Sequence, residues 1–491
     1  MTEFFIRCRL VLLLSAVALP ATSQSPRVGT QATRAALHQG TLVVTNVSVV
    51  PMTSERVITG AAVLVRNGRI EWIGPRRALK VPSGAQVVDG QGGYLMPGLA
   101  DMHTHLFSDG DEVPDSAGPS ELAVMLANGV TVARLMIGTP EQLVLRRDVT
   151  AGRVAGPQLW VASPQFTGRP SENAIVVTTA EQARAAVRTV AAEGYDFIKL
   201  TLAISSVVYD AVIDEARQRG IRVVGHVEPE VGVERALAAG QQLEHLDAYL
   251  EAVLADSSPT KRSLTQGGVF TMTNWRSLDY IDDRKIARIA GATARAGVFV
   301  GPTQNVFNTA FAIGEGDSLI RARPDYALWP AKLREMYHRA HARYWAPAND
   351  TIRTAARRQK YVDVRNRLVK AIQDSGGKIL AGSDSPEWFH SYGYALHREL
   401  QALVGAGLTP YQAIVAATRA PAEYLGTTAD WGTLEVGKRA DFILLSANPL
   451  ADIRNTTGIQ GVGAGGTWYS RAQLDTMITR AQRVITASTR S

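Results

Sequence analysis

An apolar segment of the chain ends in two histidines separated by one residue. Gly93-Tyr94-Leu95-Met96-Pro97-Gly98-Leu99-Ala100 leads through Asp101-Met102 into His103-Thr104-His105. Residues that can bind a metal follow four further short apolar runs, and they are Lys199, His226, His245 and Asp384. Four of the nine histidines belong to this series. Because the carboxyl ends of parallel strands meet on one face of a barrel, this order predicts an active site on that face.

Short apolar runs alternate with helix-like stretches through the middle of the chain, a pattern typical of repeated βα units. Eight units fit an α/β fold with a (β/α)8 TIM-like barrel, which we expect over residues 97–430. Residues 303–350 are long for a loop, so we expect helices there, lying over the barrel mouth. The strand candidates are the run ending at His105 and residues 131–136, 158–162, 197–201, 222–226, 242–245, 298–302 and 378–384. The helical stretches are residues 120–128, 179–193, 207–219, 234–239, 284–296, 351–375 and 394–406.

Both ends of the chain carry short β segments. Asn67-Gly68 separates two of them, and this dipeptide favours a two-residue hairpin turn because both positions need positive φ. Similar segments return after residue 431. We therefore expect a small composite β-sandwich domain, built from residues 41–96 and 431–491, with residues 24–40 as a linker.

The N-terminus has the pattern of a Sec-type signal peptide over residues 1–23. Arg7 and Arg9 precede an apolar run at residues 10–19, and small residues follow at Ala21 and Ser23. We expect a periplasmic or secreted protein that begins near residue 24 and has no membrane span after signal removal. The single cysteine precedes the apolar run, so the mature chain would have no disulfide.

The composition of the 491 residues is that of a globular enzyme acting on a small molecule, with 46% hydrophobic and 20% charged residues. The formal charge is +7, but the basic residues are interspersed with acidic ones. The sequence therefore argues against nucleic-acid binding. Association into a homo-oligomer stays open.

His103 and His105 lie two residues apart on a strand end, so both side chains point to the same side. Two imidazoles in this arrangement can share a divalent metal, and imidazole suits zinc. His226 and His245 could hold a second metal. Asp384 could cap a helix or act as a metal ligand that accepts a proton from bound water.

Lys199 ends the apolar run Asp196-Phe197-Ile198. A lysine at such a position is commonly an ion-pair partner, and this interpretation stays open. An uncharged lysine amine can alternatively add carbon dioxide and become a carbamate. The two carbamate oxygens could then bridge two metals about 3.5–4 Å apart.

Several motifs together resemble the amidohydrolase superfamily, specifically its binuclear metal-dependent hydrolases of the imidazolonepropionase and Xaa-Pro dipeptidase types. The segment from Pro97 to His105 is similar to the first-strand motif of that family, Gly194 to Lys199 to its bridging-lysine strand, and Gly382-Ser383-Asp384 to its eighth-strand aspartate. Residues 408–418 and 432–441 resemble its C-terminal signature.

The resemblance implies a metal-dependent hydrolase of C–N bonds in amides, small peptides or cyclic amides. It implies two divalent metals, with zinc expected, and N6-carboxylysine at Lys199. One metal would be bound by His103, His105, Lys199 and Asp384, and the other by Lys199, His226 and His245. A bridging hydroxide would attack the carbonyl, and Asp384 would act as general base and then general acid.

Substrate contacts are less well defined by the sequence. Trp388 and Tyr392 belong to an aromatic segment after Asp384, and further aromatic residues lie within residues 303–350. These rings could bind an apolar group, or they could pack the 303–350 segment onto the barrel. Tyr249 and Arg134 are further candidates for substrate contact.

Three alternatives stay open at this stage. The first is a mononuclear deaminase-type relative in which Lys199 is not carboxylated. The second is a lactone or ester hydrolase that uses the same site, and the third is a binding protein without catalytic activity. Metal stoichiometry distinguishes the first alternative from the binuclear hypothesis.

Overall fold

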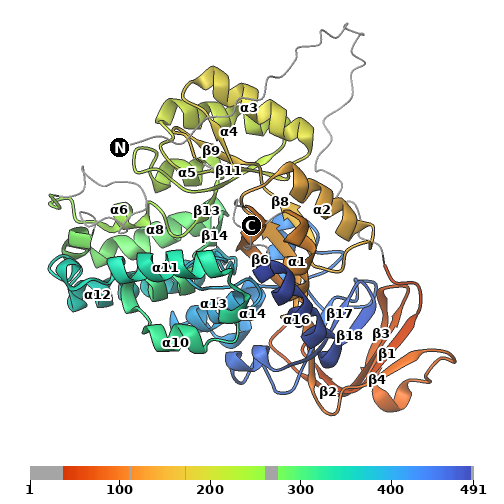
Figure 1. Cartoon of the computed structure of the whole chain (residues 1–491). Coiled ribbons are helices and arrows are strands. Elements are labelled where there is room, and N and C mark those ends of the chain that lie inside the picture. Colours follow the sequence, from red (N-terminus) through yellow and green to blue (C-terminus); the bar gives the residue numbers. More distant parts are fainter. Residues whose placement is uncertain (1–36, 110–112, 114, 172, 260–274, 488–491) are drawn as a thin grey trace, which may run out of the picture.

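The computed structural model describes residues 37–109, 113, 115–171, 173–259 and 275–487. Strands and helices alternate through the middle of this part of the chain in an α/β fold (Figure 1). The predicted signal peptide and residues 24–36 of the predicted linker lie outside the described residues. Among the described helices, none has the length and hydrophobicity needed to cross a bilayer.

All eight strands that the sequence predicts in the middle of the chain are present. They pair in parallel within two sheets, one with the order β6-β7-β8 and the other with the order β10-β9-β11-β12-β13-β14-β15. Two isolated parallel bridges, Ala162 with Phe197 and Thr104 with Ser385, connect the two sheets. This arrangement is consistent with a TIM-like barrel. The strands are β6 (Leu99–Thr104), β7 (Val130–Leu135), β8 (Gln158–Val161), β9 (Gln165–Thr167), β10 (Ala174–Val176), β11 (Phe197–Leu200), β12 (Arg222–Gly225), β13 (Gln242–Glu244), β14 (Phe299–Gly301) and β15 (Lys378–Ile379).

Helices follow most of these strands, and local sequence signals set their ends. The Thr179 side chain accepts from the backbone of Gln182 in a capping box at the start of α3. Gly194 and Gly220 end α3 and α4 in the left-handed conformation, with φ of 90° and 67°. The helices up to residue 296 are α1 (Gly118–Ala127), α2 (Pro140–Thr150), α3 (Ala180–Glu193), α4 (Ser206–Arg219), α5 (Val233–Ala239), α6 (Tyr249–Val253) and α8 (Asp283–Ala296).

The 303–350 segment contains helices, as predicted, and includes a π-helical turn at Thr309–Ile313. Seven helical stretches predicted from the sequence match observed helices within a few residues, whereas α2, α6, α14, α15 and α16 were not predicted. The remaining helices are α9 (Gln304–Asn308), α10 (Asp317–Ala322), α11 (Ala331–Tyr344), α12 (Ala355–Asp374), α13 (Tyr394–Gly405), α14 (Pro410–Ala416), α15 (Arg419–Leu425) and α16 (Arg471–Ala487).

A separate eight-stranded sheet takes its strands from both ends of the described chain, which lie together in Figure 1. Its order is β18-β17-β16-β5-β1-β2-β3, and β4 pairs with β1. The predicted hairpin at Asn67-Gly68 is confirmed, because Arg66 pairs with Arg69 and both turn residues have positive φ. The hydrogen bonding forms one continuous sheet, so the sandwich and the domain boundaries stay predictions. The strands are β1 (Thr41–Val49), β2 (Ile58–Arg66), β3 (Arg69–Pro75), β4 (Gln86–Asp89), β5 (Tyr94–Pro97), β16 (Phe442–Leu445), β17 (Ile459–Ala464) and β18 (Thr467–Ser470).

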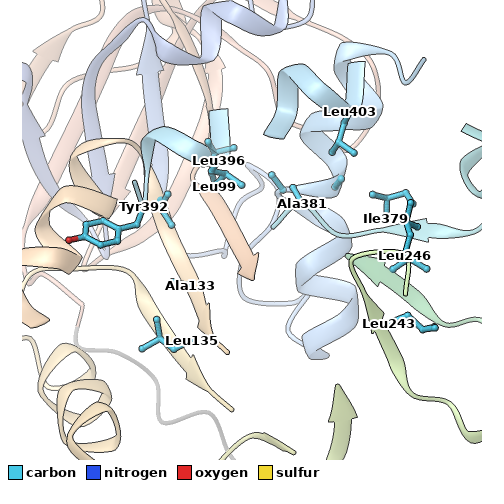
Figure 2. Close-up of a cluster of buried hydrophobic side chains, with 14 of the residues drawn as sticks. Leu99, Ala133, Leu135, Leu243, Leu246, Ile379, Ala381, Tyr392, Leu396 and Leu403 are labelled. Atoms are coloured by element: carbon cyan, nitrogen blue, oxygen red, sulfur yellow. The ribbon is translucent and has the colours of Figure 1, made fainter. Parts of the chain in front are cut away.

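The largest hydrophobic core joins strands to the helices around them. Figure 2 shows part of this core, with labelled side chains that include Leu99, Leu135, Leu243, Ile379 and Leu396. Strand β16 contributes to two cores because alternate side chains point to opposite faces. Its residues Phe442 and Leu444 pack in the core of the terminal sheet, whereas Ile443 and Leu445 pack in the largest core. Strand β16 therefore couples the terminal sheet to the rest of the chain.

Replacing Ile443 with Ala should destabilise the whole protein. The side chain is fully buried, and Gly129 approaches it so closely that a Cβ there would lie 2.5 Å from its Cδ1. We expect a loss of about 2–5 kcal/mol in the free energy of unfolding, because a cavity opens between two packed units. Urea unfolding measures this loss. Val207→Ala, at a side chain that is 67% exposed, is the control and should change the free energy by less than about 0.5 kcal/mol. Equal effects of the two substitutions would contradict the coupling through β16.

Candidate active site

One cavity of about 250 Å³ is lined by all six residues that the sequence selects as metal ligands. His103 lies in β6, and His105 follows this strand by one residue. Lys199 lies in β11, and His226 and His245 directly follow β12 and β13. Asp384 comes from the segment after β15. The carboxyl ends of parallel strands therefore deliver these side chains to one place, as the sequence predicts.

His103, His105 and Asp384 form the most compact group in the described part of the chain. Their candidate ligand atoms all lie within 4.8 Å of one another. Oδ1 of Asp384 is 3.3 Å from Nε2 of His103 and 3.4 Å from Nε2 of His105. Two imidazoles and a carboxylate that converge in this way are suitable ligands for a divalent metal such as zinc.

Backbone hydrogen bonds fix Asp384 against β6. The Asp384 amide donates to the carbonyl of His103 at 2.7 Å, and the His105 amide donates to the carbonyl of Ser385 at 2.6 Å. The buried Asp101 carboxylate accepts from the backbone and the hydroxyl of Ser383, at 3.0 and 2.6 Å. Asp384 itself has a φ of 51°, which is unusual for a residue other than glycine. The surrounding contacts hold this conformation.

A buried ion pair lies beneath His103. Oε2 of Glu244 is 2.9 Å from Nδ1 of His103, and the other oxygen of Glu244 accepts from Arg134 at 2.5 Å. Arg134 also donates to the side chain of Gln242 and to the carbonyl of Met102. Nε, Nη1 and Nη2 of Arg134 all donate hydrogen bonds, so its guanidinium is held in place. Arg134 therefore fixes the Glu244 carboxylate, which lies against the imidazole ring of His103.

His226 and His245 are oriented by hydrogen bonds to their Nδ1 atoms. Nδ1 of His226 is 2.6 Å from a carboxylate oxygen of Asp247, and Nδ1 of His245 is 2.8 Å from the hydroxyl of Thr303. The two ring centroids are 4.6 Å apart. In metal sites, a bond at one ring nitrogen commonly fixes the tautomer and directs the other nitrogen to the metal. Nε2 is therefore the ligand atom that this arrangement makes available on both rings.

The protonation states in the cavity also suit a metal. Burial lowers the pKa of His103 and of His245 well below the ordinary value, so both rings are neutral near pH 7. Burial would raise the pKa of Asp384, but His103 and His105 outweigh it and lower this pKa to about 2. Nδ1 of His105 is buried and has no hydrogen-bond partner among the described residues. Neutral imidazoles and an ionised carboxylate are the forms that bind metals. The protonation states of these residues therefore fit a divalent metal ion.

Lys199 is buried and lies close to charged groups. Its relative exposure is 2%, and burial lowers the pKa of its amine to about 8, although Glu244 and Asp384 oppose this effect. A substantial fraction of the amine is therefore uncharged at slightly alkaline pH. The uncharged form is the one that can react with carbon dioxide.

The predicted substrate contacts have different positions. Trp388 lines the cavity, whereas Arg134, Tyr249 and Tyr392 are fully buried and are not among the residues that line it. Tyr249 bonds to Thr293 on α8, and Tyr392 donates to Glu121. The hydroxyl groups of Tyr249 and Tyr392 have partners that belong to the packing of the fold, and a substrate contact of Arg134, Tyr249 or Tyr392 stays a prediction.

Two acidic residues of the candidate site, Glu244 and Glu387, were not predicted from the sequence. Glu244 precedes His245, and a carboxylate inside a buried strand is a signal that could have identified it. Glu387 lies in the aromatic segment after Asp384 and lines the cavity. Burial, together with the charge of Asp384, raises the pKa of Glu387 to about 7. An acidic residue among aromatic residues was the sequence signal that could have identified Glu387.

The model of the amidohydrolase family matches residues 94–468. The chain is similar to the imidazolonepropionase of Anaeromyxobacter sp. (strain K), with 37% identity over 108 residues, which are 20% of this chain and 26% of that protein. A structure from Bifidobacterium longum assigned as a prolidase has 25% identity and a TM-score of 0.65, and covers 90% of this chain and 99% of that chain. Bottromycin amidohydrolase has a TM-score of 0.69 and covers 92% of each chain, and at 23% identity this likeness shows the fold alone.

The pKa of Lys199 predicts a pH dependence of stability in metal-free protein. The pKa is about 8 in the folded protein, against an ordinary value of 10.5. Between these values the unfolded chain binds the proton that the folded protein has lost, so the free energy of unfolding should rise with pH. Lys199→Met removes this contribution. The stability of the wild type relative to Lys199→Met should therefore increase as the pH rises from about 8 towards 10.

Urea unfolding of both proteins with a chelator present, at several values across this pH window, measures that difference. Subtracting the free energy of unfolding of Lys199→Met from that of the wild type cancels the titration of groups that do not interact with Lys199. A difference that stays constant across the window would show that Lys199 has an ordinary pKa in the folded protein.

Proposed function

Because this chain belongs to the amidohydrolase family, we propose that it is a metal-dependent hydrolase of C–N bonds in amides, small peptides or cyclic amides. The observation that carries this proposal is the convergence of six ligand residues, from different strand ends, on one cavity. The similarity to imidazolonepropionases and to a prolidase structure supports the reaction class. The imidazolonepropionase alignment spans 26% of that protein, so it does not identify the substrate.

We propose that the site holds two divalent metals, with zinc as the expected ion. His103, His105, Lys199 and Asp384 would hold one metal, and Lys199, His226 and His245 the other. Lys199 would bind as N6-carboxylysine and contribute to both positions. When bound, the metal pair would supply the Lewis acidity that makes water nucleophilic near neutral pH and polarises a carbonyl.

The protein residues have separate tasks in this proposal. Asp384 is ionised and faces the cavity, so it can accept a proton from the attacking water and pass it to the leaving amine. Glu244 and Arg134 hold the ring of His103. Asp247 and Thr303 orient His226 and His245. Phe307, Phe311 and Trp388 form an apolar wall that can exclude water from a bound substrate.

The finer features of the fold and the location of the protein belong to the same proposal. We propose that the two parallel sheets close as a (β/α)8 barrel, because the bridges of Ala162 and Thr104 join the end of β8 to β11 and β6 to the segment after β15. The barrel would occupy residues 97–430 beside a β-sandwich made of both chain ends. The residues 1–23 would direct the protein to the periplasm or to secretion.

The alternatives differ from this proposal in measurable ways. The group of His103, His105 and Asp384 is more compact than that of the other ligands, so a mononuclear site would bind one metal there. An ester or lactone hydrolase would retain both metals and hydrolyse C–O rather than C–N bonds. A binding protein would retain metals and catalyse neither reaction.

Metal content and activity should depend together on the predicted ligands. We expect about two divalent metals per chain in the wild type, because its ligands divide over two positions. His103→Ala should lower the metal content and the hydrolysis of amides, dipeptides and cyclic imides. His38→Ala is the control, because His38 is exposed and does not line the cavity. Elemental analysis and a hydrolysis screen provide the two measurements. Full activity of thoroughly metal-stripped protein would refute the proposed function.

Asp384→Asn should separate the proton-transfer role from the role in packing. The substitution keeps the size of the side chain and removes the ionised carboxylate. We expect turnover to fall by at least about a hundredfold with the fold intact, since positioned acid–base groups contribute this much or more. Asp374→Asn, at an exposed carboxylate that ends α12, is the matched control. Turnover and metal content are measured on the same samples. Near-normal turnover of Asp384→Asn would assign proton transfer to another group.

A further inference from the structure

Glu387 occupies a distinct position in the cavity wall. It follows Asp384 by three residues and lines the same cavity, but it lies outside the proposed ligand set. Oε2 of Glu387 accepts a hydrogen bond from the hydroxyl of Tyr337 at 2.8 Å. Tyr337 belongs to α11 in the 303–350 segment. The 303–350 segment therefore orients a carboxylate of the cavity wall.

Aromatic rings surround this carboxylate. Trp388 and Phe311 line the cavity, and their ring centroids are 5.4 Å apart in a T-shaped contact. The ring of Tyr337 lies 5.9 Å from that of Trp388, also edge to face. Phe307 continues the wall beside Phe311, at 5.6 Å. Aromatic faces attract cations through their electron-rich centres, and this attraction grows when water is excluded.

The carboxylate has no cationic partner in the described part of the chain. No ion pair of Glu387 is found among those residues, and its hydrogen bond from Tyr337 comes from a neutral hydroxyl and goes to Oε2. Lys199 is the one lysine or arginine among the described residues that line the cavity, and it belongs to the proposed metal site. A partly buried carboxylate that has a neutral hydroxyl but no cation beside it is unfavourable, and a bound cation would offset this cost.

We propose that Glu387 is a specificity-determining residue that binds a positively charged amine or guanidine of the substrate, with Tyr337 as its positioning residue. This inference rests on the proposed function, because it names the substrate class of the same cavity. The cationic group would lie between the carboxylate and the rings of Phe311 and Trp388. Its aliphatic stem would pack on the apolar wall. The scissile C–N bond would face the metal ligands at the other side of the cavity.

The test compares substrates that differ by one charge. Ala-Lys and Lys-Ala are paired with Ala-norleucine and norleucine-Ala, which keep the α-ammonium group and a similar stem but lack the side-chain ammonium group. For at least one pair, the wild type should prefer the lysine peptide in kcat/KM by at least about tenfold, and Glu387→Gln should abolish most of this preference. Tyr337→Phe should reduce the preference by a smaller factor, mainly through KM. Glu335→Gln, at an exposed carboxylate on α11, should leave the ratio unchanged.

A proton-transfer role of Glu387 predicts a different result, since kcat would then fall by the same factor for charged and neutral peptides. That result, or equal kcat/KM for both members of each pair in the wild type, would overturn the inference while the proposed function stands. If none of these peptides is hydrolysed, binding decides the inference separately, and the wider hydrolysis screen decides the proposed function. Calorimetry with metal-loaded protein should then show tighter binding of lysine than of norleucine, with the difference lost in Glu387→Gln. Equal binding of the two amino acids would overturn the inference.

Discussion

The contact between β6 and the segment after β15 is the constraint on which the candidate site depends. Thr104 and Ser385 are 281 residues apart in the sequence, yet their side chains are 3.0 Å apart. The neighbouring backbone bonds place Asp384 against His103 and His105. The group of His103, His105 and Asp384 is therefore assembled by backbone hydrogen bonds between a strand and a segment distant in the sequence, and these bonds fix its geometry.

Residues that are not metal ligands in the proposal also hold the site in shape. Arg134 and Glu244 are both fully buried, so their ion pair is unfavourable to break and holds a fixed geometry under His103. The 303–350 segment contributes Thr303 to His245 and two phenylalanines to the cavity wall. One face of the cavity is thus built from strand ends and the other from a helical segment that sits over them. The first face carries the proposed chemistry, and the second shapes the space for a substrate.

The sequence predicted the parts of this arrangement that have a local signature. Apolar runs followed by histidine, lysine or aspartate identified five of the eight strands and six of the residues that line the cavity. The seven helical stretches predicted between residues 120 and 406 match observed helices within a few residues. The positions of Tyr249 and Tyr392 could not be read in this way, because a buried tyrosine and a cavity tyrosine have the same local sequence context. Tertiary contacts alone decide which surface the hydroxyl faces. Helix α16 was missed for a related reason, since its apolar residues were assigned to a region that otherwise contains short strands.

The terminal sheet is built from two parts of the chain that are distant in the sequence. This arrangement has a consequence for biosynthesis. Leu95 in β5 pairs with Leu444 in β16, and β16 in turn pairs with β17. A ribosome would therefore have released the first strands of this sheet long before their neighbour was translated. Until then the backbone edge of β5 would be unpaired, and such an edge invites association with other chains. Strand β16 completes the sheet, so the nascent chain depends on protection of the β5 edge until β16 has been translated.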